Sequence, residues 1–257
     1  MHYVSIHILY NFLLILFIDI SNASKIYIED LQTFENELKK CDTLKVVEFV
    51  IINNITISNQ IEISYNNNVK IHITSEDKNI YIKQDFSRHN NTNILYQDNN
   101  DSNLMINLSN AKEIKIDNII IYGNIGVYDT DVVSITSSNI IGDIVLNKIN
   151  DEFLIQNNYF KPSSEITDNG YIITIKESPK GTISNITFDA DINTKQVISI
   201  HDCYNLIIKN SNFNGSLNKM ESLNEFHRVF AIYDSKKIEL NNLQIQNFGD
   251  NTSEGYV

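Results

Sequence analysis

The chain of 257 residues carries a formal net charge of −12, is 42% hydrophobic and contains only 2 Pro and 8 Gly. This acidity argues against binding to nucleic acid or to anionic lipid surfaces, both of which require a basic face. It is compatible with Ca²⁺, which binds clustered oxygen atoms, and equally with a role in solubility alone. Few Gly and Pro among many β-branched residues predict an all-β fold.

Residues 1–23 are expected to be a secretory signal peptide. An apolar stretch, densest at 13–18, precedes Ser21-Asn22-Ala23, which places small residues before a cleavage point at Ser24. The stretch is shorter than the roughly 20 apolar residues that cross a bilayer. The mature chain is therefore expected to be secreted or extracellular, without insertion into a membrane.

Several Asn-x-Ser/Thr sequons occur in the mature chain. Those at Asn90, Asn100 and Asn251 lie in polar stretches and are the predicted glycosylation sites. An Asn-rich chain also forms such triplets by chance. Asn185 begins another sequon, and it is expected to stay unmodified if its side chain points inward.

The segment 24–103 is predicted to hold an N-terminal cap helix and the first strands. Residues 30–40 place apolar side chains at helical spacing behind Asp30 as the N-cap. Residues 83–103 are polar and are predicted to be a loop. Period-two alternation predicts strands at 25–28, 46–52, 55–57, 61–63, 69–73 and 80–82.

A nineteen-residue sequence pattern recurs from residue 104 to residue 257. Its clearest copy is 197–215, and the others start at Met105, Ile144, Ile172 and Val229. The starts lie 39, 28, 25 and 32 residues apart, so the variable length falls in the loop that ends each copy. Asparagine occupies the same place in every copy, at Asn118, Asn157, Asn185, Asn210 and Asn242.

Each copy is predicted to form three short strands separated by two tight corners, with the asparagine at the second corner. A sharp corner needs a residue in the left-handed region, which Asn tolerates better than other non-Gly residues. Stacked asparagines can also hydrogen-bond to one another between copies. The repeat therefore predicts a solenoid.

The apolar positions that recur in each copy, together with the recurring asparagine, resemble the right-handed parallel β-helix of the pectin lyase-like superfamily. The resemblance implies three-strand coils with an Asn ladder and an N-terminal capping helix, here at 30–40. It implies no particular reaction, because the superfamily includes lyases, hydrolases, esterases and non-catalytic surface proteins. The polygalacturonase motifs are missing, and the only arginines, Arg88 and Arg228, give no clear counterpart to the catalytic Arg of pectate lyases.

In enzymes of that superfamily the active groove follows the first strand of successive coils. Carried over by register, this implies weak catalytic candidates at Lys176, Glu177, His201, Asp202 and Asp234. The three carboxylates would stack roughly 5 Å apart, a spacing at which carboxylate pairs hydrolyse glycosides, or they could hold Ca²⁺. Corner positions also favour Asp for backbone reasons alone. No other metal or cofactor is predicted.

Exposed aromatic residues give an alternative reading of the same face. Tyr171, Tyr204 and Tyr233 lie on or near it, and a row of tyrosines can stack on sugar rings. Such rows also occur as partly buried edges of a core. The sequence therefore allows carbohydrate binding or adhesion through this face.

The two cysteines, Cys41 and Cys203, are not expected to form a disulfide, because several coils separate them. Cys203 falls where other copies carry Ala111, Asn150, Ser178 or Ser235, and it is predicted to be a small buried corner residue. The role of Cys41 is left open.

The chain is expected to stop as a new coil opens, because Val257 lies 28 residues after Val229. The expectation is a fragment, or an end covered by a further chain or a partner. The preferred functional hypothesis is a secreted or cell-surface, non-enzymatic module for carbohydrate binding or adhesion. The alternatives are a polysaccharide lyase or glycoside hydrolase and a structural spacer.

Overall fold

The computed structural model describes residues 24–41, 46–66, 68–85, 104–162, 171–190, 196–215 and 228–248. This part of the chain forms one helix, α2 (Leu31–Lys40), and twenty strands. The strands are β1 (Ser24–Ile28), β2 (Val46–Ile51), β3 (Ile55–Ile57), β4 (Ile61–Ser64), β5 (Lys70–Ser75), β6 (Tyr81–Gln84), β7 (Ile106–Ser109), β8 (Glu113–Asp117), β9 (Ile120–Tyr122), β10 (Ile125–Thr136), β11 (Asn139–Ile141), β12 (Ile144–Gln156), β13 (Tyr159–Lys161), β14 (Tyr171–Lys176), β15 (Gly181–Ser184), β16 (Thr187–Asp189), β17 (Gln196–His201), β18 (Tyr204–Asn214), β19 (Arg228–Tyr233) and β20 (Lys236–Gln246).

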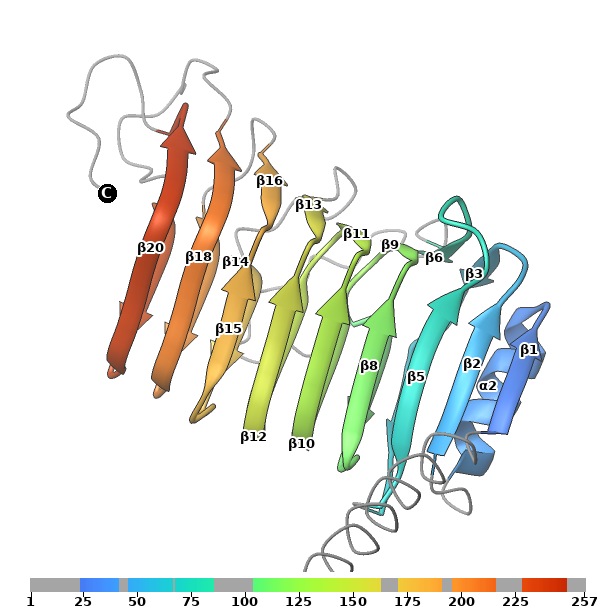
Figure 1. Ribbon diagram of the computed structural model, residues 1–257. Coiled ribbons are helices and arrows are strands. Elements are labelled where there is room, and N and C mark those ends of the chain that lie inside the picture. The colour runs from blue at the N-terminus through green and yellow to red at the C-terminus, as the bar shows by residue number, and fades with distance from the viewer. Residues whose placement is uncertain are drawn as a thin grey trace, which may run out of the picture.

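The described strands pair in parallel throughout and form three rows. The first row runs β4-β7-β10-β12-β14-β17-β19, the second β1-β2-β5-β8-β10-β12-β15-β18-β20, and the third β3-β6-β9-β11-β13-β16-β18-β20. The long strands continue through a corner and so belong to two rows. Figure 1 shows the second row side by side along an elongated molecule, with α2 beside β1 at one end. This all-β arrangement is compatible with a parallel β-helix.

The helix at the N-terminal end is the one that the sequence predicts. The side chain of Asp30 accepts a hydrogen bond from the backbone N–H of Thr33 at 2.7 Å, as an N-cap does. Phe34 and Leu38 are buried, and the ring of Phe34 packs edge-on against Phe49 with 6.1 Å between ring centroids. No helix in the described ranges is long and apolar enough to span a membrane.

The described strands form one more circuit than the copies of the nineteen-residue pattern in the sequence indicate. Strands β10 and β11 form an extra circuit within the 39 residues that separate the copy starts at Met105 and Ile144, and Ser137 takes its corner place. In the pairing, Ile144 aligns with Ile125 and Ile106 rather than with Met105. An irregularity in the β10–β12 register then places Ile149, and not Asn150, at the position of Cys203.

The five recurring asparagines all have left-handed backbone conformations, with φ between 51° and 57°. Asn157 and Asn185 are exposed, and Asn185 Nδ2 donates a hydrogen bond to Asn157 Oδ1 at 3.1 Å. The same contact joins Asn242 to Asn210 at 2.9 Å. The inward orientation that would shield Asn185 from glycosylation is therefore not observed.

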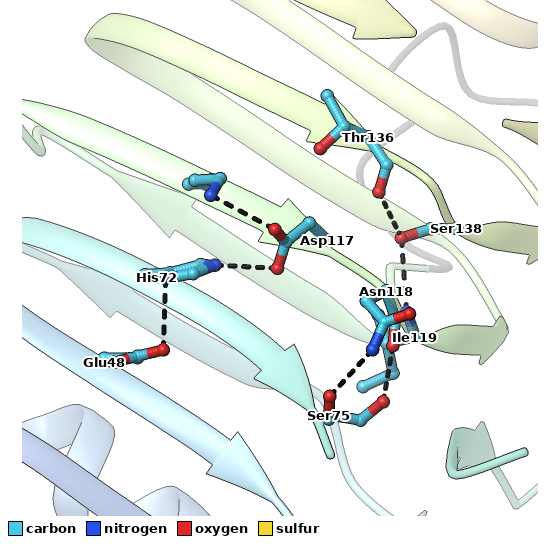
Figure 2. A network of polar contacts seen from close by, with 9 residues as sticks. Glu48, His72, Ser75, Asp117, Asn118, Ile119, Thr136 and Ser138 are labelled. Atoms are coloured by element: carbon cyan, nitrogen blue, oxygen red, sulfur yellow. Dashed lines mark hydrogen bonds and ion pairs between the residues drawn. The ribbon is translucent and has the colours of Figure 1, made fainter. Parts of the chain in front are cut away.

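Buried polar groups next to the asparagine corner satisfy the backbone there. Ser138 Oγ donates to the carbonyl of Thr136 at 2.9 Å and accepts from the N–H of Ile119 on the preceding circuit at 3.4 Å (Figure 2). Ser211 repeats this arrangement three circuits later. A small hydroxyl residue after the corner thus links circuits from inside, where an unpaired N–H would be costly.

Both cysteines are free and buried. Cys203 Sγ donates to the carbonyl of His201 at 3.0 Å, which confirms its predicted role as a small buried corner residue. Cys41 ends α2 and donates to the carbonyl of Glu37 at 3.1 Å. The predicted signal peptide at 1–23, the predicted glycosylation sites at Asn90, Asn100 and Asn251, and Val257 lie outside the described residues.

Candidate functional site

The candidates of the predicted catalytic face do lie on consecutive circuits. Lys176, His201 and Tyr233 are in register on β14, β17 and β19. The next residues along the chain, Glu177, Asp202 and Asp234, have φ of 49°, 50° and 47°. Their left-handed conformation favours short polar residues such as Asp without any catalytic demand.

The surroundings of these carboxylates do not form a recognisable reaction centre. Among the described residues, none makes a hydrogen bond or ion pair with the side chains of Glu177, Asp202 or Asp234. No three His, Cys, Asp or Glu side chains within the described ranges are placed to hold a metal ion. Within the described residues, the stack therefore has no partner that would orient an acid, a base or a cation.

The strand face beside these candidates is also closed. Thr174, Ser199 and Ala231 occupy one register position of the first row, and the sequence pattern places them outward. Instead they are 2%, 1% and 6% exposed. An enzyme that uses this face would need it open to substrate, so the expected groove is not present at these positions.

A carboxyl group with a raised pKa lies elsewhere. Burial raises the pKa of Asp143 to about 7, the direction that suits a general acid. Asp143 immediately precedes β12, whereas Glu177 immediately follows the neighbouring strand β14. The two groups therefore sit at opposite ends of the first-row strands and do not make an acid–base pair.

The aromatic residues of this face form a stacked pair rather than a flat row. The rings of His201 and Tyr233 lie 4.5 Å apart with an interplanar angle of 22°. The two rings pack against each other, so the faces in contact cannot stack on a sugar. Tyr204 is 45% exposed and begins β18, across the corner from them. The side chain of Tyr171 lies outside the described part of the structure.

A second feature, absent from the sequence prediction, is a groove of about 450 Å³ along the asparagine corner. We call it the corner groove. Four successive circuits each contribute the corner residue and the residue two places later, and Lys78 comes from the circuit before them. The lining residues are Lys78, Asn118, Ile119, Ile120, Ser137, Asn139, Asn157, Asn158, Tyr159, Asn185 and Thr187.

Some polar side chains that line the corner groove are hydrogen-bonded within the chain, and others have no described partner. Asn118 Nδ2 donates to the carbonyl of Ser75 at 2.8 Å, which fixes that amide (Figure 2). Asn185 Nδ2 donates its hydrogen bond to Asn157 Oδ1, so Asn157 Nδ2 and Asn185 Oδ1 have no described partner. The side chain of Asn139 is exposed and makes no hydrogen bond to any described residue.

An aromatic ring is held in place in the same groove. Tyr159 is half-buried, and its hydroxyl donates to Asp189 Oδ2 at 2.9 Å. Burial, and then the bond to Asp189, raise the pKa of Tyr159, so the phenol stays protonated as a donor. Among the described residues that line the groove, Lys78 is the only charged one.

A cluster of charged side chains lies close to the corner groove on the second row (Figure 2). His72 Nε2 lies 2.7 Å from Asp117 Oδ1, and His72 Nδ1 lies 3.7 Å from Glu48 Oε1. Lys115 Nζ is 3.1 Å from the other carboxylate oxygen of Asp117. No local pattern in the sequence indicates this cluster, because Glu48, His72 and Asp117 come from different circuits.

The pKa of Asp117 is held well below its usual range by this cluster. Burial acts to raise it, but hydrogen bonds from His72, Thr74 and Lys115 outweigh burial. A lowered carboxyl pKa contributes stability above the pKa of the unfolded chain, and that stability is lost as the pH falls through the folded value. The cluster thus stabilises the fold at neutral pH, next to Asn118 in the corner groove.

Replacement of Asp117 by Asn should lower the free energy of unfolding by roughly 1–3 kcal/mol at pH 7. The difference from the wild type should persist down to about pH 5 and shrink steadily below pH 4, where the carboxyl of the unfolded chain is protonated. Urea denaturation at a series of pH values measures this. Glu113→Gln is the control, because the exposed Glu113–Lys70 pair at 3.3 Å should contribute at most about 1 kcal/mol. A pH-independent effect of Asp117→Asn would contradict the assignment.

Comparison with known proteins adds no relative. No protein-family model matches the chain, and neither a curated protein nor a solved structure matches it.

Proposed function

We propose that this protein is a right-handed parallel β-helix of the pectin lyase-like kind, with an Asn ladder at its second corner, that binds carbohydrate without cleaving it. The proposal includes export of the chain to the cell surface or beyond. Three rows of parallel strands, left-handed asparagine corners and a capping helix at the first circuit support the architecture.

The corner groove is the observation that carries the proposed activity. Donors and acceptors without a described partner, such as the side chain of Asn139, Asn157 Nδ2 and Asn185 Oδ1, line the groove, which suits the hydroxyls of a sugar. Tyr159 supplies an apolar ring face with a fixed hydroxyl, the combination that packs on the C–H face of a pyranose ring. The corner groove is lined mostly by uncharged polar residues, whereas the chain as a whole is acidic.

Binding is favoured over cleavage because the described residues bring no acid and base groups together. Asp202 and Asp234 lie beside closed strand positions, and Asp143, whose pKa is raised, lies at the opposite end of the first-row strands. A structural spacer would not need a groove with an exposed amide, that of Asn139, that makes no hydrogen bond to any described residue.

A glycan array, run beside a polysaccharide-cleavage screen with and without Ca²⁺, tests the proposal. We expect binding without cleavage. Asn139→Ala and Tyr159→Ala should each weaken binding about tenfold, the loss of one hydrogen bond or one ring contact. Gln244→Ala is the matched control, because Gln244 occupies the equivalent third-row position two circuits beyond Thr187 but does not line the groove.

Two outcomes would contradict this proposal. Cleavage that disappears in Asp202→Ala or Asp234→Ala would establish the lyase or hydrolase alternative. Binding that survives Asn139→Ala but is lost in Tyr233→Ala would move the site to the aromatic pair.

A further inference from the structure

We infer that the ligand of the corner groove is a linear, uncharged glycan that lies parallel to the long axis of the molecule, with one sugar unit per circuit. This inference rests on the proposed carbohydrate binding and adds the orientation, length and charge of the ligand.

The orientation follows from the register of the strands. The corner residues of four successive circuits form one side of the groove, and the residues two places later form the other. On that second side Ile120, Asn139 and Tyr159 are in register with one another, and Thr187 continues the column. Neighbouring strands are about 4.8 Å apart, a spacing close to the advance per pyranose unit in an extended glycan. A chain along the axis would therefore meet equivalent positions at each step.

The length follows from the number of circuits. Asn118 marks one end of the groove and Thr187 the other, so four circuits span about 14 Å between the outer positions. Sugar units beyond the fourth would extend past these lining residues. Affinity should therefore rise with chain length up to about a tetrasaccharide and then level off.

The charge of the ligand follows from the distribution of cations. A polyuronate carries a carboxylate on each unit, and it would need a positive charge on each circuit. The corner groove offers one cation, Lys78, at the end beside Asn118, and the chain has a net charge of −12. Neutral glycans therefore fit better, because a charged chain would meet repulsion that a single lysine does not offset.

The groove is also arranged before a ligand arrives. Asn157 and Asn185 fix each other at 3.1 Å, and Asp189 fixes the hydroxyl of Tyr159 at 2.9 Å. Groups already held in one orientation lose little conformational entropy on binding. Asn139, which is exposed and without a described partner, still has to be ordered by the ligand.

Calorimetric titration with cello-, xylo-, manno- and chito-oligosaccharides, each from disaccharide to hexasaccharide, tests the inference. Oligogalacturonates serve as the charged counterpart. In the series that binds, affinity should rise about tenfold or more between disaccharide and tetrasaccharide and then stay constant. Asn139→Ala and Asn185→Gly should reduce this dependence on length, whereas Gln244→Ala should not. Asn185→Gly removes the amide but keeps a residue that tolerates the left-handed corner.

The outcomes separate the inference from the proposed function. Equal affinity at every length, or tighter binding of the oligogalacturonates, would overturn the inference while leaving carbohydrate binding in place. Failure of every series to bind, by a protein whose circular dichroism and thermal unfolding match a folded solenoid, would overturn both.

Discussion

Phe188→Ala should lower the free energy of unfolding by about 3–5 kcal/mol, the usual cost of deleting a fully buried aromatic ring. Phe188 is 0% exposed and lies in register between Phe160 on the preceding circuit and Phe213 on the following one. In a solenoid each circuit is stabilised mainly by its neighbours. The cavity would therefore weaken two interfaces at once.

Urea denaturation followed by circular dichroism measures this effect. Phe188→Leu keeps most of the buried volume and should cost well under half as much. Tyr204→Ala is the exposed aromatic control and should change stability by no more than about 0.5 kcal/mol. A cost below about 1 kcal/mol for Phe188→Ala would show that the third row does not pack as a continuous core.

Gly142→Ala should destabilise the protein by roughly 2–4 kcal/mol, because both the backbone conformation and the space around it exclude a side chain. Gly142 has φ of 147°, and a Cβ there would lie 2.3 Å from the carbonyl oxygen of Gly123 on the preceding circuit. That oxygen belongs to the backbone, so it cannot move aside without disturbing the parallel pairing of β9 and β11.

Gly123→Ala provides the matched control for this prediction. Gly123 has the same φ of 147°, but its added Cβ would first meet side-chain atoms, the sulfur of Met105 at 2.8 Å and the Cβ of Gln84 at 3.1 Å. It should therefore cost less than Gly142→Ala, and the difference isolates the backbone clash. Equal thermal unfolding of the two variants would show that the conformation alone sets the cost.

The sequence by itself determined the features that depend on neighbouring residues. Alternation of apolar residues, as at Ile200 and Ile208, specified strands with one face buried, and both residues are fully buried. The N-cap at Asp30 and the small buried residue at Cys203 were also predictable, because helix starts and tight corners place local steric demands on the chain. An all-β solenoid followed from these local patterns and their repetition, whereas the parallel arrangement was implied by the resemblance to a parallel β-helix.

Only the tertiary structure decided which side chains meet between circuits. His72 and Asp117 are 45 residues apart, and no local pattern joins them. The corner groove escaped prediction because Ser137 replaces asparagine in the circuit that brings Asn139 into line with Tyr159. Thr174 and Ser199 were placed outward by alternation, yet both are buried.

The physical reason is that alternation and corner preference act within a few residues, whereas register between circuits depends on inserted residues and loop lengths. One irregularity beside Asp131 shifts which residues of β12 pair with β10, and with it the residue that occupies the first corner. Whether an outward position is exposed, and which amides remain free to bind a ligand, is settled only when the circuits are stacked. The candidate binding groove is therefore a property of the stack rather than of any one repeat.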